Sequence, residues 1–287
     1  MYNLWNVNTI KELLQKNGFT FKKSLGQNFL INPTVCPEMA ENAICDGVEG
    51  VIEIGTGVGI LTAELGKRAK KVVAIELDKR LEPVLKKTLS EFSNIKIIFD
   101  DVFNVDLNAL IKEEFAGMKV AVCANLPYYI TSPVIMMLLE SKLPIESLTV
   151  MVQKEAADRI CAEVGTRESG AVTVAVNYYS CAETLFNVSR TSFVPSPNVD
   201  STVIKLSVLE KPRVNPKDEK LFFKFVRAAF AQRRKTLANS VSSSMGVDKA
   251  LVNKAIDNSG MNTNIRAEKL KMDELCKVAD ELYEILK

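Results

Sequence analysis

The chain has 287 residues, of which 47% are hydrophobic and 25% are charged, so it is long enough for one large domain and a small one. It contains no histidine, which excludes Ser-His-Asp hydrolysis, helical His-x-x-x-His zinc sites and the zinc deaminases that act on bases. No run approaches the roughly 20 apolar residues of a membrane helix, and the first residues lack a signal-peptide pattern. The sequence therefore predicts a cytoplasmic protein.

The six cysteines are scattered along the chain, and no two of them form a C-x-x-C pair. We expect them to be reduced, buried thiols rather than zinc ligands or disulfides. They are Cys36, Cys45, Cys123, Cys161, Cys181 and Cys276.

The net charge of +2 is unevenly distributed. Residues 1–210 carry 21 Lys and Arg against 25 Asp and Glu, whereas residues 211–287 carry 16 against 10. A C-terminal part with a net charge of +6 favours a polyanionic partner, although solvated helix faces give the same count.

In chain order, the first predicted element is a short helix that opens with a capping box of Thr9 and Glu12 and ends at Asn17-Gly18. A basic stretch over residues 21–26 follows. From Val51 onwards, short apolar runs alternate with amphipathic segments, a rhythm that indicates right-handed β-α-β units and a parallel sheet covered on both faces. The predicted strands are 51–54, 72–76, 95–99, 119–124 and 148–152.

The second half of the chain is less regular. Residues 172–176 alternate like a strand, but we favour a helix that starts after Gly170. Strands at 182–188 and 202–209 could close the sheet as an antiparallel edge. A linker with two prolines at 211–216 separates a domain over 1–210 from one over 211–287. Three helices are predicted in the second domain, at 218–243, 248–257 and 272–286.

A glycine-rich turn follows the first predicted strand of the sheet, with Gly55, Gly57 and Gly59 leading into a helix. Glycines let the backbone approach a ligand closely. Glu76 lies 21 residues after Gly55 at the end of the next strand, where a carboxylate can accept both ribose hydroxyls of a nucleoside. A structural turn and a surface acid are the alternatives, but together the two features predict a nucleoside cofactor. The G-x-G-x-G spacing disfavours NAD.

Two acidic residues, Asp100 and Asp101, follow the third predicted strand. From this edge of the sheet a side chain could reach the adenine amine of the cofactor. We favour Asp101 for this contact, and the alternative is that either residue caps the next helix.

The strip Asn125-Leu126-Pro127-Tyr128 directly follows the fourth predicted strand and so lies on the same edge as the glycine loop. It suits adenine's exocyclic nitrogen, a poor nucleophile because its lone pair is delocalised. An amide oxygen and a main-chain carbonyl that accept its two N–H hydrogens would localise the lone pair, and no general base is then needed. Proline stiffens the turn, and Tyr128 can stack on a flipped base. A β-turn with a buried tyrosine is the alternative.

Seven motifs, in this order along nearly the whole chain, resemble the ribosomal RNA adenine dimethyltransferases. They are Gly26-Gln27-Asn28-Phe29-Leu30, Glu53-Ile54-Gly55-x-Gly57, Ile75-Glu76-Leu77-Asp78, Asn125-Leu126-Pro127-Tyr128, Gln153-Lys154-Glu155, Phe193-x-Pro195-x-Pro197-x-Val199-Asp200-Ser201 and Gln232-Arg233-Arg234-Lys235.

This resemblance implies an α/β fold, the Rossmann-like class I methyltransferase fold with a mostly parallel seven-stranded sheet, followed by a small helical basic domain that binds RNA. The implied cofactor is S-adenosyl-L-methionine. Its methionine end would lie near Asn28 and Leu30, its core near Gly55, Gly57 and Glu76, and its adenine near Asp101. The remaining implied contacts are Asn125 to cofactor and substrate, Phe193 facing Tyr128 across the target base, and Lys22, Lys23, Arg233, Arg234 and Lys235 to RNA.

Within the family, Leu126 and the Gln-Arg-Arg-Lys segment, which we expect in a helix, resemble the housekeeping branch. That branch dimethylates two adjacent adenines near the 3′ end of small-subunit RNA, and the antibiotic-resistance branch is less similar. The implied protein is a monomer that needs no metal or membrane and acts on an immature 30S particle. Two features depart from the family pattern: Thr56 stands where proline is common, and Ser169-Gly170-Ala171-Val172 replaces a Tyr-Gly-containing stretch at a candidate RNA contact.

Three other functions compete with this interpretation. The basic C-terminal part is also typical of an assembly factor for which methylation is incidental. A DNA adenine methyltransferase uses a similar strip that usually begins with Asp, and Asn125 argues against it. A NAD-dependent dehydrogenase is disfavoured by the glycine spacing and the missing histidine.

Overall fold

The computed structural model describes residues 4–19 and 28–287. Its chain forms two compact units. The first, which we call the sheet unit, reaches to Ala157 and includes Glu183–Val208. The second, the helical unit, comprises Asp158–Ala182 and Leu209–Lys287. The chain therefore passes between the units three times, after Ala157, Ala182 and Val208, whereas the sequence analysis placed one boundary at 210.

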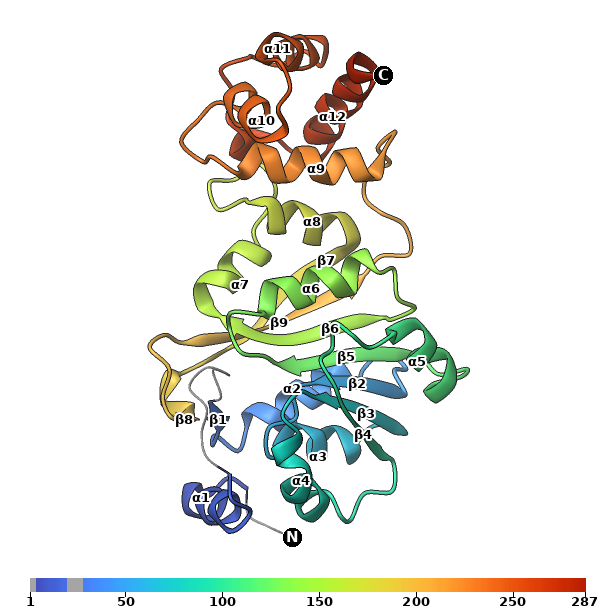
Figure 1. Ribbon diagram of the computed structural model, residues 1–287, viewed down its shortest axis with the longest axis vertical. Helices are drawn as coiled ribbons and strands as arrows, with labels where there is room; N and C mark the ends of the chain where they lie inside the picture. Colours follow the sequence, from blue (N-terminus) through green and yellow to red (C-terminus); the bar gives the residue numbers. More distant parts are fainter. Residues whose placement is uncertain (1–3, 20–27) are drawn as a thin grey trace. The chain divides into compact units, whose positions relative to one another are not determined.

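A seven-stranded sheet has the order β4-β3-β2-β5-β6-β9-β7, which can be followed upwards in Figure 1. The five strands from β4 to β6 run parallel, and β9 pairs antiparallel with β6, as the sequence predicted. The strands are β2 (Gly50–Ile54), β3 (Lys71–Glu76), β4 (Ile95–Phe99), β5 (Val120–Asn125), β6 (Ser147–Gln153), β7 (Ser180–Val188) and β9 (Ser201–Val208).

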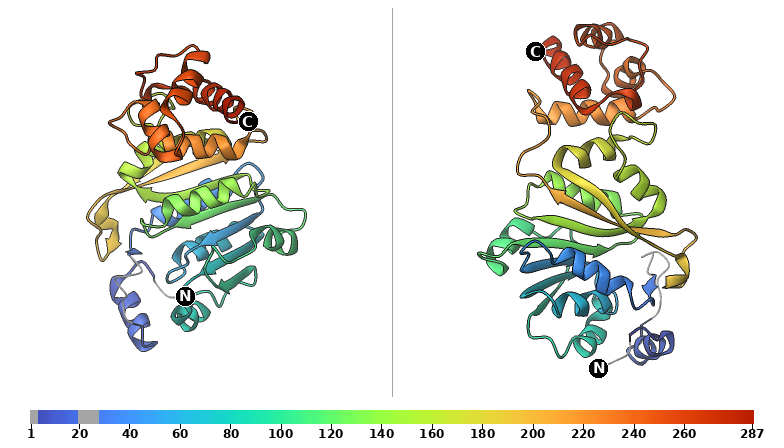
Figure 2. Two further views of the ribbon diagram at one scale, coloured as in Figure 1. Left: turned by 45° about the horizontal axis from the view of Figure 1, so that its top comes forward. Right: turned by 180° about the vertical axis from the view of Figure 1, so that it is seen from behind.

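Apolar runs place the central strands inside the sheet. Every residue of β2 is buried, and so are five of the six in β5, because a parallel sheet with helices along both faces leaves no strand face to water. Helix α2 contacts β5 and β6, and α3 contacts β3 (Figure 2). The helices before α7 are α1 (Val7–Lys16), α2 (Val35–Ala43), α3 (Ile60–Gly66), α4 (Glu82–Thr88), α5 (Leu107–Glu114) and α6 (Thr131–Glu140).

The first helix begins earlier than predicted. Asn6, not Thr9, is its N-cap, and the Asn6 side chain accepts hydrogen bonds from the backbone N–H groups of Asn8 and Thr9. An asparagine in an extended conformation satisfies the free N–H groups of the first turn, which leaves Thr9 inside the helix. The predicted end at Asn17 is confirmed.

The helical unit confirms the helix after Gly170. Thr173 Oγ1 accepts from the Gly170 N–H and donates to the Arg159 carbonyl, which fixes the start of that helix. Ser169, within the segment that departs from the family pattern, is buried and closes a tight turn with Gly165 and Thr166. The helices of this part are α7 (Lys154–Ile160), which enters from the sheet unit, α8 (Ala171–Tyr179), α9 (Glu219–Phe230), α10 (Leu237–Met245), α11 (Lys249–Asn258) and α12 (Met272–Leu286).

The single helix predicted over 218–243 is wrong, because two helices, α9 and α10, occupy this range. Thr236 accepts the N–H of Asn239 as the N-cap of α10, and Ser240 accepts the N–H of Gln232. The intervening turn over 231–236 therefore contains the basic Gln-Arg-Arg-Lys segment, which we expected in a helix. Among the described residues, no helix is long and apolar enough to span a bilayer.

All six cysteines lie among the described residues, and none of them forms a disulfide. Cys36, Cys123 and Cys276 are buried, as predicted, whereas Cys45 and Cys161 are partly buried. Cys181 is exposed, contrary to expectation, because it lies on β7, the edge strand of the sheet. Its sulfur accepts a hydrogen bond from Arg213 at 3.1 Å.

Candidate active site

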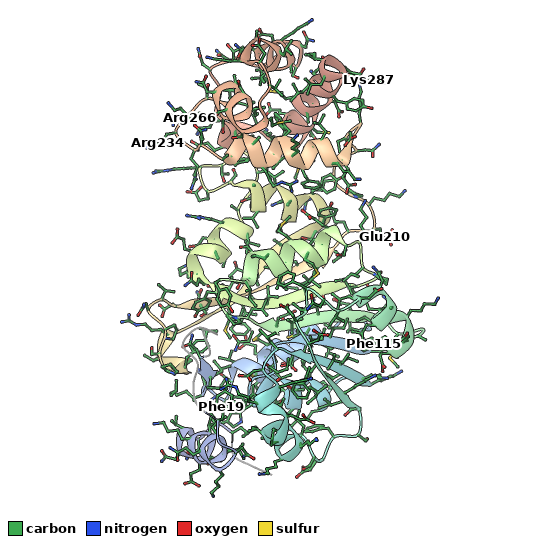
Figure 3. The ribbon with its side chains drawn as sticks, viewed as in Figure 1. Phe19, Phe115, Glu210, Arg234, Arg266 and Lys287 are labelled. Carbon is green, nitrogen blue, oxygen red and sulfur yellow. The ribbon has the colours of Figure 1, made fainter. Side chains whose placement is uncertain are left out.

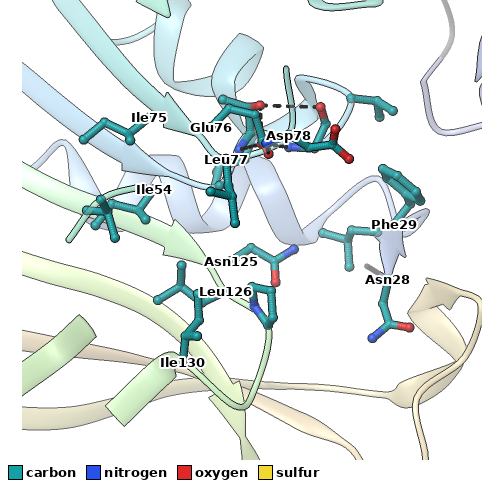
Figure 4. Close-up of a pocket in the computed structure, with 18 of the residues that line it drawn as sticks. Asn28, Phe29, Ile54, Ile75, Glu76, Leu77, Asp78, Asn125, Leu126 and Ile130 are labelled. Carbon is teal, nitrogen blue, oxygen red and sulfur yellow. Dashed lines mark hydrogen bonds between the residues drawn. The ribbon is translucent and has the colours of Figure 1, made fainter. Parts of the chain in front are cut away.

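A pocket opens at the carboxyl ends of the parallel strands, within the sheet unit (Figure 4). Its walls come from the loops after β2, β3, β4 and β5, which meet at one edge because the strands run in the same direction. Two further segments, at residues 28–30 and at Phe193, complete the lining.

The glycine loop needs its glycines. Gly55, Gly57 and Gly59 have φ values of 82°, 54° and 91°, which L-residues with a Cβ rarely adopt. A Cβ on Gly59 would also lie 3.1 Å from the hydroxyl of Thr88. The loop therefore turns tightly from β2 into α3 and presents its backbone to the pocket.

Glu76 ends β3 and is buried beside the glycine loop. Its Oε2 accepts hydrogen bonds from Thr56 N at 2.9 Å, Thr56 Oγ1 at 2.8 Å and Gly57 N at 3.1 Å. Its Oε1 accepts from Asp78 N at 2.9 Å. The carboxylate thus ties the end of β3 to the loop after β2, and Thr56 supplies two donors that a proline at this position would lack.

The strip Asn125-Leu126-Pro127-Tyr128 forms a turn at the end of β5. The Pro127 carbonyl accepts from Ile130 N at 3.1 Å and from Thr131 Oγ1 at 3.3 Å. A Cβ on Gly55 would lie 3.8 Å from the Asn125 carbonyl oxygen, so the strip and the glycine loop are adjacent.

Tyr128 is half-buried, and its hydroxyl lies 2.8 Å from Ser201 Oγ at the start of β9. This hydrogen bond fixes the ring from both ends: the turn holds the backbone, and Ser201 holds the hydroxyl. The turn anticipated as the alternative is therefore present, together with a tyrosine that lines the pocket.

Phe193 reaches the pocket through a short second sheet. β1 (Phe29–Leu30) pairs antiparallel with β8 (Phe193–Val194), with Leu30 opposite Phe193, and Ile31 N donates to the Ser192 carbonyl. The sequence did not predict these two-residue strands. They bring Asn28, Leu30 and Phe193 to the same pocket as the strip.

The pocket is electronegative. Four carboxylate side chains line it, and no Lys or Arg does among the described residues. Such a lining favours a cation and repels phosphate. The four acids are Glu76, Asp78, Asp100 and Asp101, of which Asp101 Oδ1 accepts from Phe103 N and so caps a turn rather than a helix.

Beneath the glycine loop, Glu53 is fully buried on β2. Burial raises the pKa of its carboxyl to about 8; a nearby Thr62 hydroxyl opposes the shift and Glu76 adds to it. Neither Glu53 oxygen has a hydrogen-bonding partner at ordinary geometry among the described residues. This raised pKa favours the protonated form of the carboxyl at neutral pH.

The structure brings the predicted pocket residues together in one cavity. Their assigned roles remain predictions, as does RNA binding by Lys22 and Lys23, which lie outside the described residues. The predicted residues that line the pocket are Asn28, Leu30, Gly55, Gly57, Glu76, Asp101, Asn125, Leu126, Pro127, Tyr128 and Phe193.

Sequence reasoning missed several residues of the pocket wall. Val102 and Tyr129 line it, and each directly follows a residue that the sequence analysis had singled out; Leu77 also lines it and belongs to a quoted motif, but it had no assigned role. These residues could have been predicted as pocket residues because each stands next to a singled-out residue in a loop at the edge of the sheet.

The basic turn of the helical unit exposes Arg233, Arg234 and Lys235. Arg233 Nη2 donates to the Arg167 carbonyl at 2.8 Å. Leu237 N at the start of α10 donates to the Ile265 carbonyl, which places the exposed Arg266 next to this turn (Figure 3). Arg266 was not predicted because it belongs to no run of basic residues: Ile265 and Ala267 flank it, and Glu268 follows.

The fold and pocket together define a Rossmann-like methyltransferase with a glycine loop, an acid at the next strand end and an Asn-Leu-Pro-Tyr strip on one sheet edge. The family model for ribosomal RNA adenine dimethylase matches residues 18–284, and the chain belongs to this family. Membership decides against the NAD-dependent dehydrogenase alternative.

Curated relatives cover nearly the whole chain. It is 46% identical over 280 residues to the ribosomal RNA small subunit methyltransferase A of Geobacillus sp. (strain WCH70), covering 96% of each. For the protein of that name from Anoxybacillus flavithermus the identity is 47% over 279 residues, covering 96% of this chain and 95% of the other.

Two solved structures share the architecture. A dimethyladenosine transferase from Plasmodium falciparum has a TM-score of 0.72 at 26% identity, covering 90% of this chain and 98% of its own. The 23S rRNA methyltransferase ErmE has a TM-score of 0.66 at 25% identity, and the match covers 89% of this chain and 100% of ErmE.

Proposed function

We propose that the protein dimethylates N6 of two adjacent adenines near the 3′ end of small-subunit (16S) ribosomal RNA, using S-adenosyl-L-methionine. It acts in the cytoplasm as a monomer on immature 30S particles and needs no metal. The observation that carries the proposal is the position of the Asn125-Leu126-Pro127-Tyr128 turn against the glycine loop, inside one anionic pocket.

The residues of the pocket fit this cofactor. Among the described residues, Glu76 Oε1 accepts only the Asp78 N–H and keeps a lone pair for a ribose hydroxyl, the glycine loop leaves room for close approach, and the acidic lining suits a sulfonium cation. Leu77 and Val102 supply apolar surface for a purine. When bound, S-adenosyl-L-methionine would supply an electrophilic methyl group, whose bond to sulfur would break as the adenine nitrogen attacks the methyl carbon in line and a neutral thioether leaves.

The strip prepares the adenine amine. Two acceptors are needed for its two N–H hydrogens, and the Pro127 carbonyl is already engaged by Ile130 and Thr131. The Asn125 side-chain oxygen and the Leu126 carbonyl are therefore the acceptors that we assign. They draw the nitrogen towards tetrahedral geometry and localise its lone pair.

Tyr128 and Phe193 hold the base in place. Tyr128 is fixed by Ser201, and Phe193 by the pairing of β8 with β1, so both rings are preorganised. After methyl transfer the amine is briefly cationic and loses a proton to solvent without a dedicated base. Positioning of the two reactants supplies most of the rate.

The test is to incubate the protein with undermethylated small subunits and labelled cofactor, then to map methylated bases by mass spectrometry. Asn125→Ala should lower kcat at least about 100-fold, because the lost acceptor acts on the reacting nitrogen, and leave cofactor affinity largely intact. Asn104→Ala, an exposed asparagine on the same edge outside the pocket, should keep full activity. An active Asn125→Ala enzyme, or no label in the RNA, would contradict the proposal.

An assembly-factor role is the second candidate, and the exposed Arg233, Arg234, Lys235 and Arg266 favour it. Growth and subunit profiles of a deletion strain should be compared with those of an Asn125→Ala strain. If the variant rescues the deletion, binding of the subunit is the essential activity; if it does not, methylation is.

A further inference from the structure

Large apolar side chains remain exposed at one edge of the sheet unit. Leu77, Phe103, Tyr129 and Val199 all lie in loops after strands or before β9, and Tyr129 is the most exposed of them at 61%. Single exposed apolar residues are ordinary on a protein surface, so one that also lines a pocket is the one that points to a ligand. Among the described residues two aromatic rings are exposed, those of Phe103 and Tyr129, and of this pair only Tyr129 lines the pocket.

Tyr128 and Tyr129 have different environments although they are neighbours in the chain. Tyr128 is half-buried and bonded to Ser201, whereas Tyr129 is exposed. Both belong to the turn closed by the hydrogen bond from Ile130 N to the Pro127 carbonyl. A strand of RNA that delivers one base to Tyr128 therefore passes its next nucleotide near Tyr129.

The charge of the pocket decides what kind of contact can hold that nucleotide. Glu76, Asp100 and Asp101 repel phosphate, whereas the charge of Asp78 is balanced by Arg80 at 2.6 Å, and no described Lys or Arg lines the pocket itself. Local affinity for RNA must then come from the bases. Stacking on an aromatic ring tolerates any base and does not depend on phosphate charge.

Extracting the target adenine also leaves its neighbour without a stacking partner. An exposed tyrosine replaces that partner at low entropic cost, because its side chain has few rotatable bonds. We propose that the ring of Tyr129 stacks on the nucleotide adjacent to the target adenine. This inference rests on the proposed function and adds a second base-binding position to the same site.

Because the strand keeps one direction through the site, the Tyr129 position holds the other target adenine during one methylation and a flanking nucleotide during the second. Loss of the ring should then weaken the use of RNA and leave the cofactor site unchanged. Tyr129→Ala should lower kcat/KM for undermethylated small subunits about 5- to 100-fold, mostly through KM. Tyr129→Phe keeps the ring and should stay within about twofold of the parent.

Phe103→Ala is the matched control, since Phe103 is an exposed aromatic on the same edge that does not line the pocket. It should keep the parent kcat/KM. An equal loss in Phe103→Ala would show a general effect of exposed apolar surface and overturn the assignment. A weaker cofactor affinity in Tyr129→Ala, measured by calorimetry, would instead place the ring on the cofactor and also overturn it.

A double-mutant cycle tests the contact itself. Small subunits reconstituted with an abasic nucleotide next to the target adenine should lose as much kcat/KM as Tyr129→Ala, and the combined change should cost little more. Additive losses would refute the stacking contact. An inactive parent enzyme would overturn the proposed function, whereas an active parent with an unimpaired Tyr129→Ala variant would overturn this inference alone.

Discussion

Glu53 is a buried carboxyl group whose protonation state should control how stability depends on pH. Its pKa is about 8 in the folded protein against an ordinary value of 4.5, because burial disfavours the charged form. Between these values the folded state binds more protons than the unfolded state. The contribution of Glu53 to the free energy of unfolding therefore falls as pH rises from about 4.5 to about 8.

Glu53→Gln should remove this dependence. The parent should lose up to about 1.4 kcal/mol of stability per pH unit in that window relative to the variant. The difference in slope is the measure, because a buried amide without partners carries its own cost of about 1–3 kcal/mol. Urea unfolding at several pH values between 5 and 8 reports it, and parallel curves for the two proteins would show that Glu53 stays ionised.

At the scale of elements, a single threonine joins the loop after β2 to the end of β3. The Thr56 hydroxyl donates to Glu76 at 2.8 Å, alongside the backbone donors of the same loop. Thr56→Val preserves shape and removes this donor from a buried carboxylate. The free energy of unfolding should fall by about 1–3 kcal/mol, a typical range for a hydrogen bond to a charged group.

Thr56→Ser provides the control for this prediction, because it keeps the hydroxyl and removes only a methyl group. It should retain most of the parent's stability in urea unfolding without cofactor. Equal stability of Thr56→Val and the parent would mean that the backbone donors of Thr56 and Gly57 hold Glu76 unaided.

The parallel strands were predictable because both faces of the sheet are buried, which leaves continuous apolar runs such as 51–54 and 148–152. Strands β1 and β8 were not predictable from the sequence. Each has only two residues, too few to show an alternating pattern, and the two strands that pair lie far apart in the chain. The break between α9 and α10 was missed because the 218–243 pattern stays helical in composition while Thr236 and Ser240 supply a new start.

The sequence predicted those site residues that stand at the ends of strands, such as Gly55, Glu76 and Asn125, because the strands themselves could be predicted. Contacts between distant segments were not recoverable. The bond from Tyr128 to Ser201 joins residues 73 positions apart, and no local pattern encodes it.

At the scale of the whole molecule, the two units differ in the charge that they offer a ligand. The sheet unit presents a pocket lined by carboxylates, which suits a cationic cofactor. The helical unit exposes a basic turn at 233–235 together with Arg266, which suits phosphate. We therefore expect contacts to RNA phosphates and the chemistry on the base in different parts of the chain.

Replacing Arg234 tests whether the basic turn of the helical unit binds RNA phosphate. Arg233 also donates to the Arg167 carbonyl, so replacing it would disturb the fold, whereas Arg234 is simply exposed. If Arg234 contacts one phosphate, Arg234→Ala should weaken RNA binding uniformly across sequences. The plot of log K against log salt should become shallower by about 1.

Lys112→Ala is the matched control, because Lys112 is exposed on α5 beside Glu113 and Glu114 and should meet no phosphate. Its salt dependence should equal the parent's. Binding of small-subunit RNA at several salt concentrations measures both variants. An unchanged slope in Arg234→Ala would remove the basic turn from the RNA interface, while an equal change in Lys112→Ala would show that net charge, rather than this turn, governs binding.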